Sequence, residues 1–195
     1  MFIIGSLAIA AATTAIEVKS LAGAWTARCH KAGLIGGSFV EESLAFFVDA
    51  TFVREIRNFS ASDCAPATLL DVRAFEGRYA LGDQDKTVRD ARAVDFVIDG
   101  VFRTPLGANA VKAANDTRLC SDTDWKRGVR RSITGVLCNG EILKPGTAAF
   151  DVVQLTDGKL VFGRDSFFRT GDASKERPKE LDPDLTFSPA VASAH

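Results

Sequence analysis

Hydrophobic and polar residues alternate along most of this chain, and Gly, Asp and Pro interrupt the alternation at short intervals. Alternation with a period of two is typical of β-strands that bury one face. Tight hairpins are predicted at Asp49-Ala50 and Asp157-Gly158, and a turn or bulge at Gly77. Strands are predicted over residues 21–29, 39–48, 52–59, 68–75, 78–81, 94–98, 129–138, 149–155 and 159–164.

One long segment, residues 103–128, lacks this alternation and is rich in Asn, Asp, Thr and Ala. Within it, Ala110, Val111 and Ala114 recur at roughly helical spacing, so residues 109–115 are predicted to form a short helix. A loop of this length usually covers or binds something, which makes it a candidate contact surface.

The composition changes again from residue 171 onward. Three of the six prolines and a charge cluster fall there, and no helical stripe is visible. We expect residues 171–195 to be a Pro-rich charged tail. The tail is either disordered or lies across the outside of the folded domain through Leu181, Leu185 and Phe187.

About eight or nine short strands with one interposed helix predict an all-β protein, either a sandwich or a closed barrel. Closure removes the edge strands, and an eight-stranded barrel has an interior that side chains fill or that holds one small ligand. We therefore expect residues 17–170 to form a single domain, an antiparallel β-barrel of about eight strands with one short helix in a long loop.

Composition narrows the possible functions. The chain of 195 residues has 24 Lys and Arg against 25 Asp and Glu, so it lacks the positive charge that attracts nucleic acid or anionic membrane surfaces. It has 14 Phe but one Tyr and two His, which means much apolar area and little titrating chemistry. The common hydrolase, zinc-protease, P-loop and dinucleotide motifs are absent, so we expect no enzymatic activity and no cofactor.

The first 16 residues carry no charged side chain, and the first ionisable group is Glu17. This apolar stretch is shorter than the roughly 20 residues of a spanning helix, and small residues follow its bulkiest part. Residues 1–16 are therefore predicted to be a signal peptide of a secreted or periplasmic protein without an integral membrane span. A buried first strand or helix is the alternative.

Export also accounts for the four cysteines, because an oxidising compartment lets them pair. Three connectivities are possible, and sequence order favours Cys29 with Cys64 and Cys120 with Cys138. Zinc binding is the alternative, but no CxxC occurs and His30 would point away from Cys29 on a strand. We therefore expect no metal site. A general-base role for His30 is weighed against a simple position at the surface end of a strand.

Gly23-Ala24-Trp25, on the first predicted strand, resembles the GxW signature that opens a lipocalin barrel. In lipocalins this Trp closes one end of the barrel against an Arg late in the chain. The resemblance implies that Trp25 and Arg164 close the barrel here.

A second resemblance spans residues 21–140. It is carried by the Leu21 to Trp25 segment, Cys29-His30, Phe46 to Arg54, Phe59 to Pro66 with Cys64, and Gly77 to Gly82. This succession is similar to the ectodomain modules of the adenomatosis polyposis coli down-regulated protein family. The resemblance implies a lipocalin-like barrel that holds a lipidated or otherwise apolar ligand.

Phenylalanines on alternating strands are the candidate lining of a ligand cavity. If Phe52, Arg54 and Ile56 face inward together, burial of the charge costs several kcal/mol unless Arg54 meets a carboxylate or a ligand headgroup. The alternative is that Arg54 faces solvent. The predicted ligand-contacting residues are Phe46, Phe52, Arg54, Phe96 and Phe162.

The sequence thus predicts an exported, lipocalin-like barrel that binds a small apolar or amphipathic molecule in its interior. The alternative is a secreted protein-interaction or inhibitor module that uses the 103–128 loop to contact a protein partner. A hydrolase with paired loop carboxylates, Asp122 with Asp124 or Asp182 with Asp184, is the third hypothesis. Turn formation explains these Asp pairs more simply.

Overall fold

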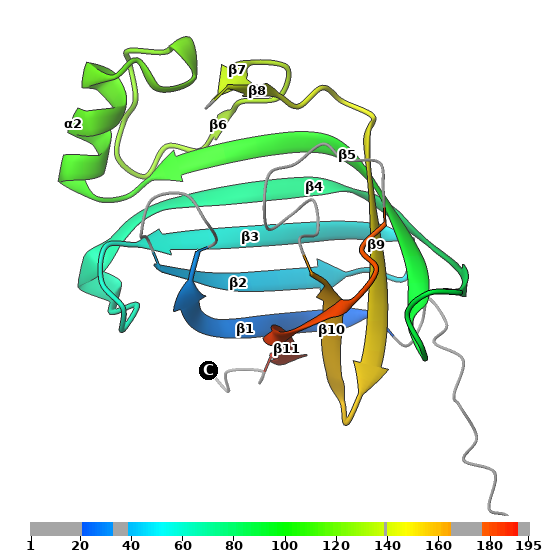
Figure 1. The fold of residues 1–195 in the computed structure, drawn as a ribbon. Coiled ribbons are helices and arrows are strands. Elements are labelled where there is room, and N and C mark those ends of the chain that lie inside the picture. Colours follow the sequence, from blue (N-terminus) through cyan, green and yellow to red (C-terminus); the bar gives the residue numbers. More distant parts are fainter. Residues whose placement is uncertain (1–20, 33–38, 139, 165–176, 191–195) are drawn as a thin grey trace, which may run out of the picture.

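The computed structural model describes residues 21–32, 39–138, 140–164 and 177–190. Within these ranges the chain forms a closed antiparallel barrel of eight strands, which confirms the predicted fold class (Figure 1). The order around the barrel is β1-β2-β3-β4-β5-β9-β10-β11, and β11 pairs with β1 to close it. The barrel strands are β1 (Gly23–Lys31), β2 (Phe39–Phe46), β3 (Thr51–Phe59), β4 (Leu69–Gln84), β5 (Arg92–Pro105), β9 (Thr147–Thr156), β10 (Lys159–Gly163) and β11 (Leu181–Pro189).

The connection between β5 and β9, residues 106–146, is here called the cap. Figure 1 shows its elements grouped together beside β5. They are the helix α2 (Ala108–Asp116), the turn η2 (Leu119–Ser121) and the short strands β6 (Arg131–Ser132), β7 (Leu137–Cys138) and β8 (Glu141–Ile142). A further turn, η1 (Pro66–Thr68), precedes β4. The predicted helix over 109–115 thus forms as part of the cap, with Ala114 buried.

The two predicted strands on either side of Gly77 are one strand of 16 residues, β4. Gly77 marks a bulge in the pairing of β4 with β5, between Glu76 and Gly77. A Cβ atom at position 77 would lie 2.0 Å from the carbonyl oxygen of Val97. Glycine therefore lets the strand continue through a close backbone approach where any other residue would force a shift.

The hairpin predicted at Asp157-Gly158 joins β9 to β10. Both residues have positive φ, 49° for Asp157 and 70° for Gly158. A type I′ turn requires positive φ at both central positions, and Asp-Gly meets that requirement at little cost.

The eighth strand comes from the Pro-rich tail, contrary to the prediction of a disordered or externally packed segment. β11 pairs with β1 through Trp25 and Pro189, and with β10 through Leu160 and Phe187. Leu185 and Phe187 are buried in the core. The boundary predicted at residue 170 therefore does not separate barrel from tail, and residues 171–176 lie outside the described ranges.

The strand predicted over 129–138 is also corrected. Pairing between β5 and β9 ends at Ile98 and Thr147, so the rest of β5 takes the two-residue strand β6 as its neighbour instead. The chain then turns away, which buries Ile133 and leaves Val129 and Leu137 exposed. Alternation in this segment reflects packing of a loop rather than a continuous strand.

Both predicted disulfides are present. Cys29 of β1 bonds Cys64 in the β3–β4 loop, and Cys120 of η2 bonds Cys138 of β7. The first links neighbouring parts of the barrel rim, and the second holds the two halves of the cap together. The predicted signal peptide, residues 1–16, lies outside the described residues. None of the helices in the described ranges has the length and apolar character that a bilayer crossing requires.

Candidate ligand-binding site

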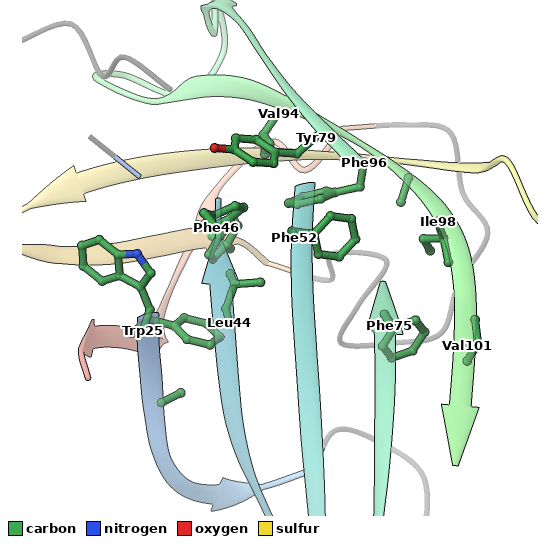
Figure 2. Packing of buried hydrophobic residues seen from close by; sticks show 14 of the residues in the cluster. Trp25, Leu44, Phe46, Phe52, Phe75, Tyr79, Val94, Phe96, Ile98 and Val101 are labelled. Carbon is green, nitrogen blue, oxygen red and sulfur yellow. The ribbon is translucent and has the colours of Figure 1, made fainter. Parts of the chain in front are cut away.

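Aromatic rings fill one half of the barrel interior. The Phe46 ring lies 4.7 Å from Tyr79 and 6.3 Å from Phe96, and Phe52 lies 5.0 Å from Phe96. Figure 2 shows these rings packed together, with Phe75 further along the barrel. Three of the predicted ligand-contacting residues therefore contact one another in the core.

The other half of the interior carries polar side chains. Glu42 pairs with Ile56, Ile56 with Arg73, and Arg73 with Arg103 across neighbouring strands. Directly paired residues of an antiparallel sheet lie on the same face, so these side chains share the inner face with the apolar core. We call this end of the barrel the mouth. Its polar residues are His30, Glu42, Arg54, Asn58, Asp71, Arg73 and Arg103.

Arg54 faces inward, and Glu42 is the carboxylate that it meets. Each of the two residues is 4 % exposed. Arg54 Nε donates a hydrogen bond of 2.9 Å to Glu42 Oε2, its Nη2 donates to the same oxygen, and His30 Nε2 lies 3.3 Å from Glu42 Oε1. Burial raises the pKa of Glu42, but the charge of Arg54 and hydrogen bonds from His30 and Arg54 together outweigh it and lower the pKa. Glu42 is therefore ionised at neutral pH.

A second, partly buried ion pair lies beside the first. Arg103 Nη2 donates a hydrogen bond of 2.8 Å to Asp71 Oδ2, and Asn58 Nδ2 donates one of 2.9 Å to Asp71 Oδ1. Each carboxylate oxygen of Asp71 thus has its own donor, as a buried carboxylate requires.

Arg73 differs from both of its arginine neighbours. Its guanidinium carbon lies 4.7 Å from the centre of the Phe75 ring. Within the described part of the chain, its guanidinium makes no hydrogen bond and no ion pair within 4.0 Å. Burial and the positive charge of Arg103 lower the pKa of Arg73, and the charge of Arg54 acts in the same direction, whereas Glu141 and Asp71 oppose it.

The cap covers the mouth above Arg73. Ile133 N–H donates a hydrogen bond of 2.9 Å to the Val101 carbonyl, and Gly146 N–H one of 2.8 Å to the Ile98 carbonyl. A small cavity of about 20 Å³ remains between barrel and cap, enough for one water-sized group. Its walls are Arg73, Val101 and Arg103 from the barrel and Ile133, Val136, Cys138, Glu141 and Leu143 from the cap.

The other predicted site residues lie elsewhere. Phe162 of β10 is buried, with its ring 5.6 Å from that of Phe187. Trp25 is buried and donates its Nε1–H to the Leu21 carbonyl at 2.8 Å. Arg164 forms an ion pair of 2.6 Å with Glu180, with two fifths of its side chain exposed.

The mouth residues other than Arg54 and His30 were not singled out from the sequence, although a signal for some of them exists. Glu42 lies between Val40 and Leu44 on the strand face that alternation assigns to the core. Arg73 likewise lies two residues before Phe75, so the same alternation assigns both side chains to one face of the strand. A charged residue at an inward position of an otherwise apolar strand face is the pattern that identifies such a site.

A larger groove of about 350 Å³ lies on the outer face of β1, β2 and β3. Arg28, Glu41 and Arg57 contribute charges of both signs to its rim, and Arg28 and Arg57 are exposed. Among the described residues, no group of three or more His, Cys, Asp or Glu side chains is placed to hold a metal ion.

No model of a protein family matches this chain, and no curated protein matches it. The eight-stranded closed antiparallel barrel is compatible with a lipocalin-like barrel.

Proposed function

We propose that this protein is an exported, lipocalin-like binding protein, not an enzyme, and that it holds a small apolar or amphipathic molecule in the barrel beneath the cap. The observation that carries the proposal is the division of the barrel interior into an aromatic half and a charged mouth. Apolar cap side chains, Ile133, Val136 and Leu143, face this mouth. A molecule with an apolar body and a polar end matches both halves of this surface.

Two further features support the proposal. The two disulfides fit a protein that folds in an oxidising compartment, where such bonds persist. His30, the histidine weighed as a general base, lies against Glu42 Oε1 and has its Nδ1 2.9 Å from the Arg28 carbonyl. Both of its nitrogens are therefore held by the protein itself.

Binding of N-phenyl-1-naphthylamine, an uncharged apolar fluorophore, tests the proposal. We expect saturable binding at one site, with about tenfold weaker affinity in Val136→Trp, because the larger side chain fills the cavity under the cap. Leu137→Trp is the matched control, because Leu137 is the next residue in the chain and its side chain is 53 % exposed, outside the walls of the cavity. Absence of saturable binding, or equal affinities in both variants and the wild type, would contradict the proposal.

A protein partner is the second candidate, favoured by one observation on the cap. Leu137 and Ile142 pair across β7 and β8 and are 53 % and 47 % exposed. Adjacent exposed apolar side chains mark interaction surfaces more often than isolated ones do. If this surface is the functional one, Leu137→Asp abolishes capture of the partner and leaves fluorophore binding intact.

A further inference from the structure

The mouth contains three arginines but only two of them have a carboxylate partner in contact. Arg54 is bound by Glu42, and Arg103 is bound by Asp71. Arg73 is paired with Ile56 on β3 and with Arg103 on β5. Its guanidinium carbon lies 4.7 Å from the centre of the Phe75 ring, and among the described residues it has no hydrogen-bond or ion-pair partner. Glu141 and Asp71 act on Arg73 electrostatically, but none of the described carboxylates lies within ion-pair distance of its guanidinium, which is unusual for a half-buried cation.

We propose that the ligand of the mouth is an amphipathic monoanion, of which a carboxylate is the simplest, and that Arg73 binds its charged group. This inference rests on the proposed binding function and adds the chemical class of the ligand. It assigns the headgroup contact to Arg73 rather than to Arg54, whose hydrogen bonds are taken by Glu42.

The geometry around Arg73 suits a carboxylate. The contact between the guanidinium and the Phe75 ring, 4.7 Å from carbon to ring centre, uses no N–H group in a hydrogen bond, which leaves these groups as donors. Two parallel N–H groups match the two oxygens of a carboxylate, so a single anion satisfies the arginine in a bidentate contact. Burial and the charge of Arg103 disfavour the cationic state of Arg73, and a bound anion would offset both effects.

The size and walls of the cavity indicate how the rest of the ligand is held. A volume of about 20 Å³ holds one water-sized group, so a carboxylate headgroup and its hydrocarbon chain enter only when the space between barrel and cap widens. Val101 on the barrel and Ile133, Val136 and Leu143 on the cap are the apolar walls around it. An apolar chain attached to the headgroup would therefore lie between barrel and cap, and its entry requires the cap to shift.

Glu141 provides an internal check, because its carboxylate lines the same cavity and acts electrostatically on Arg73. An incoming anion is repelled by Glu141 and attracted by Arg73. Removal of the Glu141 charge should therefore strengthen anion binding, whereas removal of the Arg73 charge should weaken it.

Dansylated undecanoic acid and dansylated undecanol, which differ only in the charged end, test the inference by fluorescence titration of the purified full chain. We expect the wild type to bind the acid about tenfold more tightly than the alcohol. Arg73→Met should reduce affinity for the acid to that for the alcohol, and Glu141→Gln should increase it severalfold. Arg78→Met is the matched control, because Arg78 lies on the same strand but on the exposed outer face, paired with Asp99.

The outcomes separate the two proposals. If the acid and the alcohol bind equally, or if Arg73→Met binds the acid as tightly as the wild type does, the inference is wrong while the binding function stands. If neither probe nor the uncharged fluorophore binds, the binding function fails and the inference fails with it. If acetate displaces the acid as effectively as decanoate does, the site takes small anions and the amphipathic ligand is refuted. Thermal unfolding of Arg73→Met should show no loss of stability, because no hydrogen bond or ion pair is removed and an unfavourably buried charge is lost.

Discussion

Removal of the Arg54 side chain beyond its aliphatic part, in Arg54→Met, should destabilise the barrel strongly at neutral pH. Glu42 is 4 % exposed, and Arg54 and His30 are the two partners of its carboxylate described above. The substitution removes Arg54 and leaves His30. Breaking a buried ion pair from one side costs about 3–5 kcal/mol, because the other charge stays buried and uncompensated. We expect a loss of this size in the free energy of unfolding.

The loss should depend on pH in a defined direction. In the wild type the pKa of Glu42 is lowered, so its contribution to stability is present above the pKa of an unfolded Glu and disappears as the pH falls through the folded value. Without Arg54, burial is the largest effect and raises the pKa, so Glu42 takes up a proton on folding. The variant should therefore regain stability relative to the wild type as the pH falls towards about 4.

Urea unfolding followed by fluorescence measures this effect, because Trp25 and Trp125 are both buried. Arg78→Met is the control, since its exposed pair with Asp99 should contribute about 0–1 kcal/mol. The double substitution Glu42→Met with Arg54→Met removes both charges and should recover most of the loss. A loss below about 1 kcal/mol in Arg54→Met, or an equal loss at neutral and acid pH, would refute the reasoning.

Three further predictions concern the fold. Gly77→Ala should cost roughly 3 kcal/mol in urea unfolding, because the added Cβ meets the Val97 carbonyl oxygen; a cost near zero would disprove that close approach. Burial raises the pKa of Tyr79, the single tyrosine, so its phenolate absorbance should appear above about pH 10. The free energy of unfolding should fall as the pH rises through the pKa of the folded state, and a phenolate that forms with the pKa of an unfolded tyrosine would contradict this. Arg177→Ala should cost about 1–2 kcal/mol, because Arg177 hydrogen-bonds two carbonyls on β5 and β9 and pairs with Asp95; unchanged unfolding would show that these contacts contribute nothing.

Local patterns were sufficient for much of the architecture. Period-two alternation identified most of the barrel strands, Asp157-Gly158 identified a hairpin, and Ala110 to Ala114 identified the helix. These features depend on interactions between residues close in sequence or on the burial of one strand face, which composition and spacing record directly. The disulfide pairing also followed sequence order, because each bond joins segments that adjacent strands and loops bring together.

The tail shows what such patterns miss. Pro183 and Pro189 lower the strand propensity of residues 181–189, yet this segment completes the barrel between β1 and β10. Its partners, Trp25 and Leu160, are distant in sequence, and the gain from burying Leu185 and Phe187 outweighs the local preference. Only closure of the whole barrel creates the position that this strand occupies.

The mouth shows the same division between local pattern and tertiary contact. Alternation alone left two positions open for Arg54, the inner face or the solvent face of its strand. It was enough to predict that an inward Arg54 needs a carboxylate or a ligand headgroup as its partner. The choice of Glu42 as partner, and the absence of an equivalent contact for Arg73 among the described residues, depend on register between strands and on the cap above them. Charge pairing depends on distances of a few ångströms between chain segments far apart in sequence. Those distances exist only after the barrel has closed and the cap has folded over its mouth.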